Sequence, residues 1–338
     1  MINTLPFTNA SMVNTLHQIA DRIIVAKDFT EDMSLVNGQA GMCLFLFHYA
    51  QTMEREEYYE KAQTFLIENY RFLVRQVKHP NSTVVPGIGW LISHLGHRKL
   101  IGIDTDEILN HVDKVIFEKL QYGFSPLFDQ GGLLDMTGYL LQRYGETGFE
   151  VTKVMIAEKL LAVIDEIRIK MDDGLFKGFD RHYAPLPAKG GLNKMGYLSA
   201  LLHFSSRVLG VGIYPVIIRE MQAEIIALLK EYVAIGQAAN YFTTDIVHGF
   251  TTLLRVRDAL GRAGVEMEEV QATLEELGKM LPGMANSMRK RDLVLGYKLL
   301  EPGAKEGPAI RQLLQAGVLR DLERESGMPD LGLCGGLA

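Results

Sequence analysis

Gly41-Met42-Cys43-Leu44-Phe45-Leu46-Phe47-His48-Tyr49-Ala50 is apolar at nearly every position. A helix through these residues has no polar face, which is typical of a helix buried on every side. A different pattern follows between Tyr58 and Val77, where apolar residues recur three or four positions apart among Glu, Lys, Gln and Arg. The apolar set there is Tyr59, Ala62, Leu66, Tyr70, Leu73 and Val77. This spacing predicts an amphipathic helix that buries one face.

The amphipathic spacing returns further along the chain, and almost no segment alternates as a strand would. Residues 151–167 and 216–229 both contain it, through Ala157, Leu160, Ile164 and Ile167 and through Ile218, Met221, Ile225 and Leu228. The sequence therefore predicts an all-α fold.

Glycine opens the apolar segments at intervals of 40 to 59 residues, near Gly38, Gly87, Gly132, Gly191, Gly249, Gly296 and Gly336. Two helices with their loops need about this length, so the chain has room for about seven helical hairpins. An open solenoid would leave both helices of each hairpin partly exposed, whereas a closed double ring would bury the apolar helices inside. We therefore expect one α/α toroid domain over residues 1–338, with residues 170–191 as a long ordered loop.

Composition excludes several classes of protein. The chain is 47% hydrophobic and 22% charged, which predicts a globular protein with a large core. Its net charge of -6 argues against nucleic-acid binding, which needs a basic surface. No run of about 18 apolar residues predicts a membrane helix, and no signal peptide is visible. With only Cys43 and Cys334 as cysteines, we expect a cytoplasmic protein without a disulfide framework.

The glycine-led segments resemble the repeats of the lanthionine synthetase C-like (LanC-like) family, in particular its bacterial members. The resemblance covers most of the chain, is patchy over residues 170–212, and depends on the order of several short motifs. They are Leu35-Val36-Asn37-Gly38-Gln39-Ala40-Gly41, Gly87-Ile88-Gly89-Trp90, Val247-His248-Gly249 and Leu331-Gly332-Leu333-Cys334-Gly335-Gly336-Leu337-Ala338. It implies a toroid of seven inner and seven outer helices that acts in peptide modification. The last motif stops at Ala338, so the final repeat is expected to be incomplete.

The resemblance also implies a zinc site that this chain has lost. Family cyclases bind zinc through one cysteine motif and a Cys-His pair about 45 residues later, and the metal activates a substrate thiol for thioether formation. Here Arg289 stands where the first ligand would be, and Cys334 is followed by Gly335 in place of histidine. One ligand of three remains, so we expect neither bound zinc nor another cofactor. The charge of Arg289 would instead favour an anionic ligand.

Several residues are candidates for the site. His248, in the His-Gly motif, would move protons, and Asp129 would lie near the inner cavity; helix capping is the simpler role for either. Arg181 and His182, in the long loop, and Arg289 are candidates for substrate binding, although each suits a solvated loop or turn as well. Cys334 is either a residual metal ligand or a buried thiol.

Two other residues have simpler predicted roles. Cys43 is expected to be a core residue, and we do not expect it to form a metal pair with His48, five positions later. Gly38-Gln39-Ala40-Gly41 is expected to reflect close packing at a helix start or the close approach of a ligand.

Three functional hypotheses follow. The first is a LanC-like enzyme of peptide modification with lost or altered zinc catalysis. The second is a non-catalytic scaffold that binds a peptide or partner in its ring. The third is a carbohydrate-active α/α-ring enzyme, which would need two paired carboxylates from Asp129, Asp135, Asp180 and Asp245.

Overall fold

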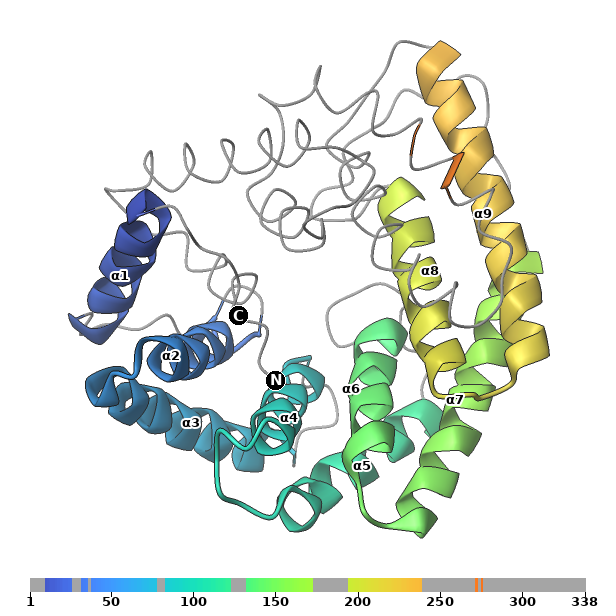
Figure 1. The fold of residues 1–338 in the computed structure, drawn as a ribbon. Helices are drawn as coiled ribbons and strands as arrows, with labels where there is room; N and C mark the ends of the chain where they lie inside the picture. Colours follow the sequence, from blue (N-terminus) through green and yellow to red (C-terminus); the bar gives the residue numbers. More distant parts are fainter. Residues whose placement is uncertain are drawn as a thin grey trace.

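The computed structural model describes residues 10–25, 32–35, 38–77, 83–122, 132–172 and 194–238, and residues 271, 272 and 275. Regular structure in these residues is helical and includes no strand, which confirms the all-α prediction. The helices in Figure 1 are α1 (Ala10–Val25), α2 (Gln39–Met53), α3 (Glu56–Gln76), α4 (Val85–His97), α5 (Thr105–Tyr122), α6 (Leu133–Glu146), α7 (Glu150–Asp172), α8 (Lys194–Gly210) and α9 (Pro215–Ala238). No helix in the described part of the chain is long and apolar enough to span a membrane.

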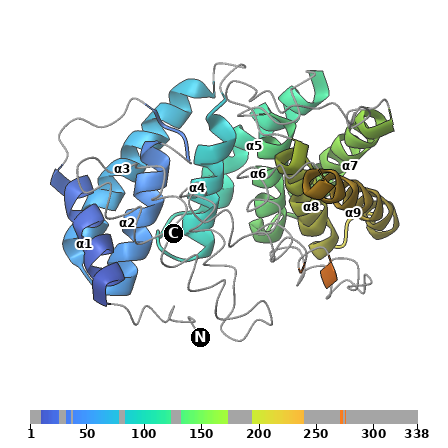
Figure 2. The same ribbon diagram turned by 90° about the horizontal axis from the view of Figure 1, so that it is seen from above.

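The helices from α2 to α9 form two rows along a curved path. Consecutive helices pair as hairpins, α2 with α3, α4 with α5, α6 with α7 and α8 with α9. Alternate helices also touch, α2 with α4, α4 with α6 and α6 with α8. We call α2, α4, α6 and α8 the inner row, because they line the concave side of the arc, and α3, α5, α7 and α9 the outer row (Figure 1). Figure 2 shows from above how the hairpins follow one another.

Helices α2, α4 and α6 run in the same direction. The His48 side chain, late in α2, reaches His94, late in α4. Gly89, early in α4, lies against Tyr139 in the first half of α6, and Ser93 donates a hydrogen bond to Glu146 at the end of α6. Each of these three helices therefore returns to the same direction after one hairpin, as a repeat of helical hairpins requires.

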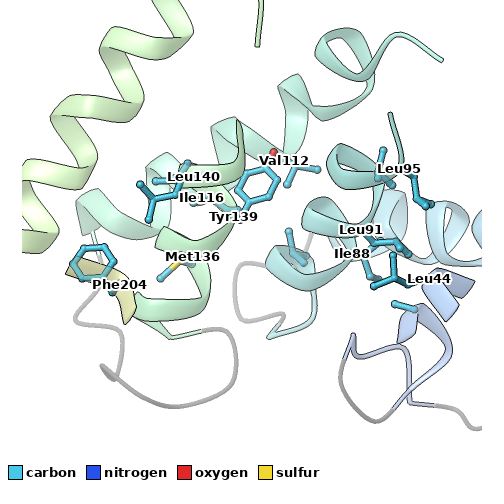
Figure 3. Close-up of a cluster of buried hydrophobic side chains, with 14 of the residues drawn as sticks. Leu44, Ile88, Leu91, Leu95, Val112, Ile116, Met136, Tyr139, Leu140 and Phe204 are labelled. Atoms are coloured by element: carbon cyan, nitrogen blue, oxygen red, sulfur yellow. The ribbon is translucent and has the colours of Figure 1, made fainter. Parts of the chain in front are cut away.

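The inner row holds much of the hydrophobic core. Every residue of α2 from Gln39 to Ala50 is buried except the partly exposed His48, so the prediction of a helix buried on every side holds for residues 41–50 apart from His48. Figure 3 shows side chains of the inner helices packed with those of α5: Leu44, Ile88, Leu91, Leu95, Val112, Ile116, Met136, Tyr139, Leu140 and Phe204. Because one continuous core joins both rows, removing a side chain here costs packing with several helices.

Two glycines of the predicted motifs are required by close packing. A Cβ at Gly38 would lie 2.3 Å from the backbone oxygen of Asp32, and one at Gly89 would lie 2.7 Å from the ring of Tyr139. Gly38 and Gly132 directly precede α2 and α6, and Gly87 lies in the first turn of α4, as the repeat predicts. At Gly38 the close-packing interpretation of the helix-start glycines is confirmed.

The amphipathic predictions hold for α7 and α9 but fail in one detail for α3. Leu160, Ile164, Ile167, Ile218, Met221 and Ile225 are all buried. In α3, however, Tyr70 is 40% exposed and the neighbouring Asn69 is buried in its place. Asn69 donates hydrogen bonds to the Phe65 carbonyl oxygen (2.8 Å) and to Gln39 Oε1 (3.4 Å), which offset the cost of burying its amide.

Candidate functional site

A line of partly exposed residues follows the concave side of the inner row. The other faces of these helices pack against their neighbours, so the residues left open to solvent share a helical spacing of three and four. The described members of this line are His48 on α2, Gly87, Trp90 and His94 on α4, Asp135, Gly138 and Gln142 on α6, and Ala200, His203 and Arg207 on α8. We call this set the inner face. It joins aromatic, imidazole, carboxylate and guanidinium groups, which is typical of a ligand-binding surface.

At the α2–α4 end of the inner face lies an aromatic cluster of His48, Trp90 and His94. The imidazole of His94 stacks on the Trp90 indole, with ring centroids 4.8 Å apart and planes at 14°. Its Nε2 lies 3.2 Å from Nε2 of His48. An N–H···N hydrogen bond at this distance needs one donor and one acceptor nitrogen, so the neutral pair shares a single proton. The cluster presents a flat aromatic surface beside a polar edge, which suits stacking against a planar or apolar ligand group.

His94 is held in its neutral form. Burial lowers its pKa from 6.5 to about 4, and the positive charges of His48, Arg98 and His97 act in the same direction. At neutral pH the ring can therefore accept or donate a hydrogen bond without carrying charge.

A second polar group lies where α4 and α6 end. The Glu146 carboxylate accepts hydrogen bonds from Ser93 and Gln142, and His97 Nδ1 lies 4.0 Å from it. Burial raises the pKa of Glu146, and the two hydrogen bonds partly oppose that rise. Only His97 is well exposed, at 57% of its side chain, so this cluster joins the two helices more than it contacts solvent.

The most buried charge in the described structure joins the two rows. Arg143 of α6 is 1% exposed and lies 2.9 Å from Asp106 and 3.0 Å from Asp113, both on α5. The Tyr139 hydroxyl donates a hydrogen bond to Asp113, and the Gly148 amide donates one to Asp106. Burial alone would lower the pKa of Arg143, but the carboxylates outweigh it and raise it. We interpret this cluster as a structural clamp between α5 and α6.

The candidate site residues predicted from sequence lie outside the described residues. They are Asp129, Arg181, His182, His248, Arg289 and Cys334. One of the predicted roles falls on a described residue and is tested. Cys43 is fully buried, its thiol donates to the Ala62 carbonyl oxygen at 3.4 Å, and burial raises its pKa, so its role as a core residue is confirmed. The predicted partner in the discounted metal pair, His48, lies with its Nε2 3.2 Å from Nε2 of His94. The described part of the chain has no group of three or more His, Cys, Asp or Glu residues placed to hold a metal.

The aromatic cluster was not predicted from the sequence, because its two histidines are far apart in the chain. A usable signal was present in the repeat. His48 and His94 each lie nine residues after the first residue of their helix, which is Gln39 for α2 and Val85 for α4. Equivalent positions of successive parallel helices lie side by side, so a comparison by repeat register would have paired them.

Comparison with known proteins identifies no relative. No family model, no curated protein and no solved structure matches this chain.

Proposed function

We propose that this chain forms an α/α toroid of the LanC-like kind and binds a peptide on the inner face, in peptide modification without zinc chemistry. The inner face itself carries the proposal, because aromatic and hydrogen-bonding groups lie together on the concave side of a row of parallel helices. Stacking on Trp90 and hydrogen bonding to His48 and His94 suit the mixed polar and apolar character of a peptide.

The resemblance supplies the remaining parts of the proposal. His248 would move protons at the bound peptide, with Asp129 beside the cavity, and Arg181, His182 and Arg289 would bind the peptide or its carboxylates. Without a metal to lower the pKa of a substrate thiol, thiol addition would be slow at neutral pH. A cytoplasmic location agrees with a protein that meets newly made peptides.

The test uses Trp90, which is the only tryptophan of the chain. Purified protein is titrated with a peptide that contains dehydroalanine and one cysteine, and the fluorescence of Trp90 is followed. We expect a saturable change in the fluorescence, and weaker binding for His94→Gln. Asp165→Asn, on the exposed side of α7, is the matched control and should bind as the natural sequence does. The absence of any peptide-dependent change, with calorimetry also negative, would overturn the proposal.

The same incubation separates an enzyme from a scaffold. Thioether formation consumes the peptide thiol without changing the mass, so the product resists alkylation in a mass spectrum. Loss of the thiol that depends on His248, without zinc in elemental analysis, would indicate a modifying enzyme. Binding with the thiol intact would indicate a peptide-binding scaffold, our second candidate, and binding of oligosaccharides in place of peptides would favour the carbohydrate-active alternative.

A further inference from the structure

Helix α3 of the outer row exposes a line of apolar side chains to solvent. Ile67, Tyr70 and Val74 are 51%, 40% and 46% exposed, and their spacing of three and four places them on one line along the helix. Single exposed apolar residues are ordinary, but a continuous line on one helix is typical of a contact surface.

Charged residues flank this line, with an acidic residue toward the start of α3 and basic residues toward its end. Glu60 precedes it and Arg71 and Arg75 follow it, and all three are exposed. At 100° per residue they lie on the same side of the apolar line. Arg75 Nε donates to the Arg71 carbonyl oxygen at 3.3 Å, and no ion pair joins these three side chains to another described residue.

We propose that a second copy of this chain packs on α3, with the two α3 helices antiparallel about a two-fold axis at Ile67. Glu60 lies seven residues before Ile67 and Arg75 eight residues after it, which is about 10 and 12 Å along a helix. The two-fold axis lies between the two helices and is perpendicular to both. It reverses the helix direction, but charged residues on one side of the apolar line stay on that same side of the interface in both copies. Glu60 of one copy therefore comes beside Arg75 of the other, twice in the dimer, with the apolar lines between them.

The surface fits a second copy because it is self-complementary. An isologous interface needs one patch that matches its own rotated image, and an acidic start with a basic end meets that condition. A single helix pair makes a small interface, so the dimer forms reversibly. The flanking ion pairs lie at its rim, where they set orientation and make association sensitive to salt.

The first test is sedimentation velocity of the full chain from low to high micromolar concentration. We expect a monomer–dimer equilibrium that salt weakens. Tyr70→Glu places a carboxylate in the apolar centre and should weaken dimerisation at least about tenfold. Ile169→Glu, on the 56% exposed Ile169 of α7, is the matched control and should leave the equilibrium unchanged.

The second test exchanges the charges. Glu60→Arg and Arg75→Glu should each weaken self-association, because like charges then oppose each other. A mixture of the two variants should recover a heterodimer with two ion pairs, one of the natural polarity and one of the reversed polarity. A chain that stays monomeric throughout, a dimer that Tyr70→Glu leaves intact, or a mixture that fails to associate would each overturn the proposal. Circular dichroism of every variant confirms that its helices are intact.

Discussion

The inner and outer rows are both helical, yet they expose different kinds of side chains to solvent. Inner helices show solvent a narrow line that includes His48, Trp90, His94 and Arg207, while outer helices show broad faces of charged residues with apolar lines such as that of α3. The difference follows from packing, since an inner helix is enclosed by neighbours on most sides and an outer helix on only one. A side chain left open on the inner row is thus a stronger indication of function than one on the outer row.

The clamp between the rows should give the largest effect on stability. Asp113→Ala leaves the buried charge of Arg143 with Asp106 as its remaining partner, and we expect a loss of about 3–5 kcal/mol in the free energy of unfolding. Urea denaturation measures it. The double variant Asp113→Leu with Arg143→Met should recover most of the loss, and Lys114→Ala, on the exposed side of α5, should cost little. A mild effect of Asp113→Ala would show that the rows are held together elsewhere.

The second largest effect on the free energy of unfolding is expected from the contact between α4 and α6 in the inner row. Gly89→Ala places a Cβ 2.7 Å from the Tyr139 ring, so α4 and α6 must separate, and we expect a loss of about 1–3 kcal/mol. Gly145→Ala, in α6 with open space around its Cβ, is the matched control and should stabilise by about 0.5–1 kcal/mol. Equal stability of the two variants would contradict the close approach of the inner helices.

The neutral state of His94 predicts a pH dependence of stability. Its pKa is about 4 in the folded chain and 6.5 as the ordinary value, so between these values the unfolded chain binds a proton that the folded chain does not. The free energy of unfolding therefore falls as the pH is lowered from 6.5 to 4, by about 1–2 kcal/mol after allowing for the partial exposure of the ring. Urea denaturation across this range measures the slope. His94→Gln should flatten it, whereas His111→Gln, exposed on α5, should not.

Exposed positions of the outer row should give the smallest effect. Val151 is 73% exposed on α7, and we expect Val151→Thr to change the free energy of unfolding by less than about 0.5 kcal/mol. Thermal denaturation followed by circular dichroism is sufficient. A larger loss would indicate that this part of the outer row is covered by another element or another molecule.

The class of the fold and the starts of the first inner helices were predictable from sequence, because burial on every side requires apolar residues at all positions around a helix. Residues 41–50 meet that condition, and so the apolar helix α2 was expected. The sequence did not predict that Asn69, and not Tyr70, lies on the buried face of α3. Both residues lie within the range of one helical face, and the choice depends on Gln39 of another helix, which accepts the Asn69 hydrogen bond.

The spacing of apolar residues along the chain thus predicted the helices and the alternation of apolar with amphipathic ones, and the positions of the glycines indicated where the first inner helices start. Tertiary structure alone decided which distant side chains meet. The clamp forms only when α5 packs on α6, because α5 carries Asp106 and Asp113 and α6 carries Tyr139 and Arg143. His48 and His94 are likewise 46 residues apart and become neighbours only because two inner helices run parallel in register. Spacing along a chain reports the faces of one helix, whereas the pairing of faces depends on how the helices pack.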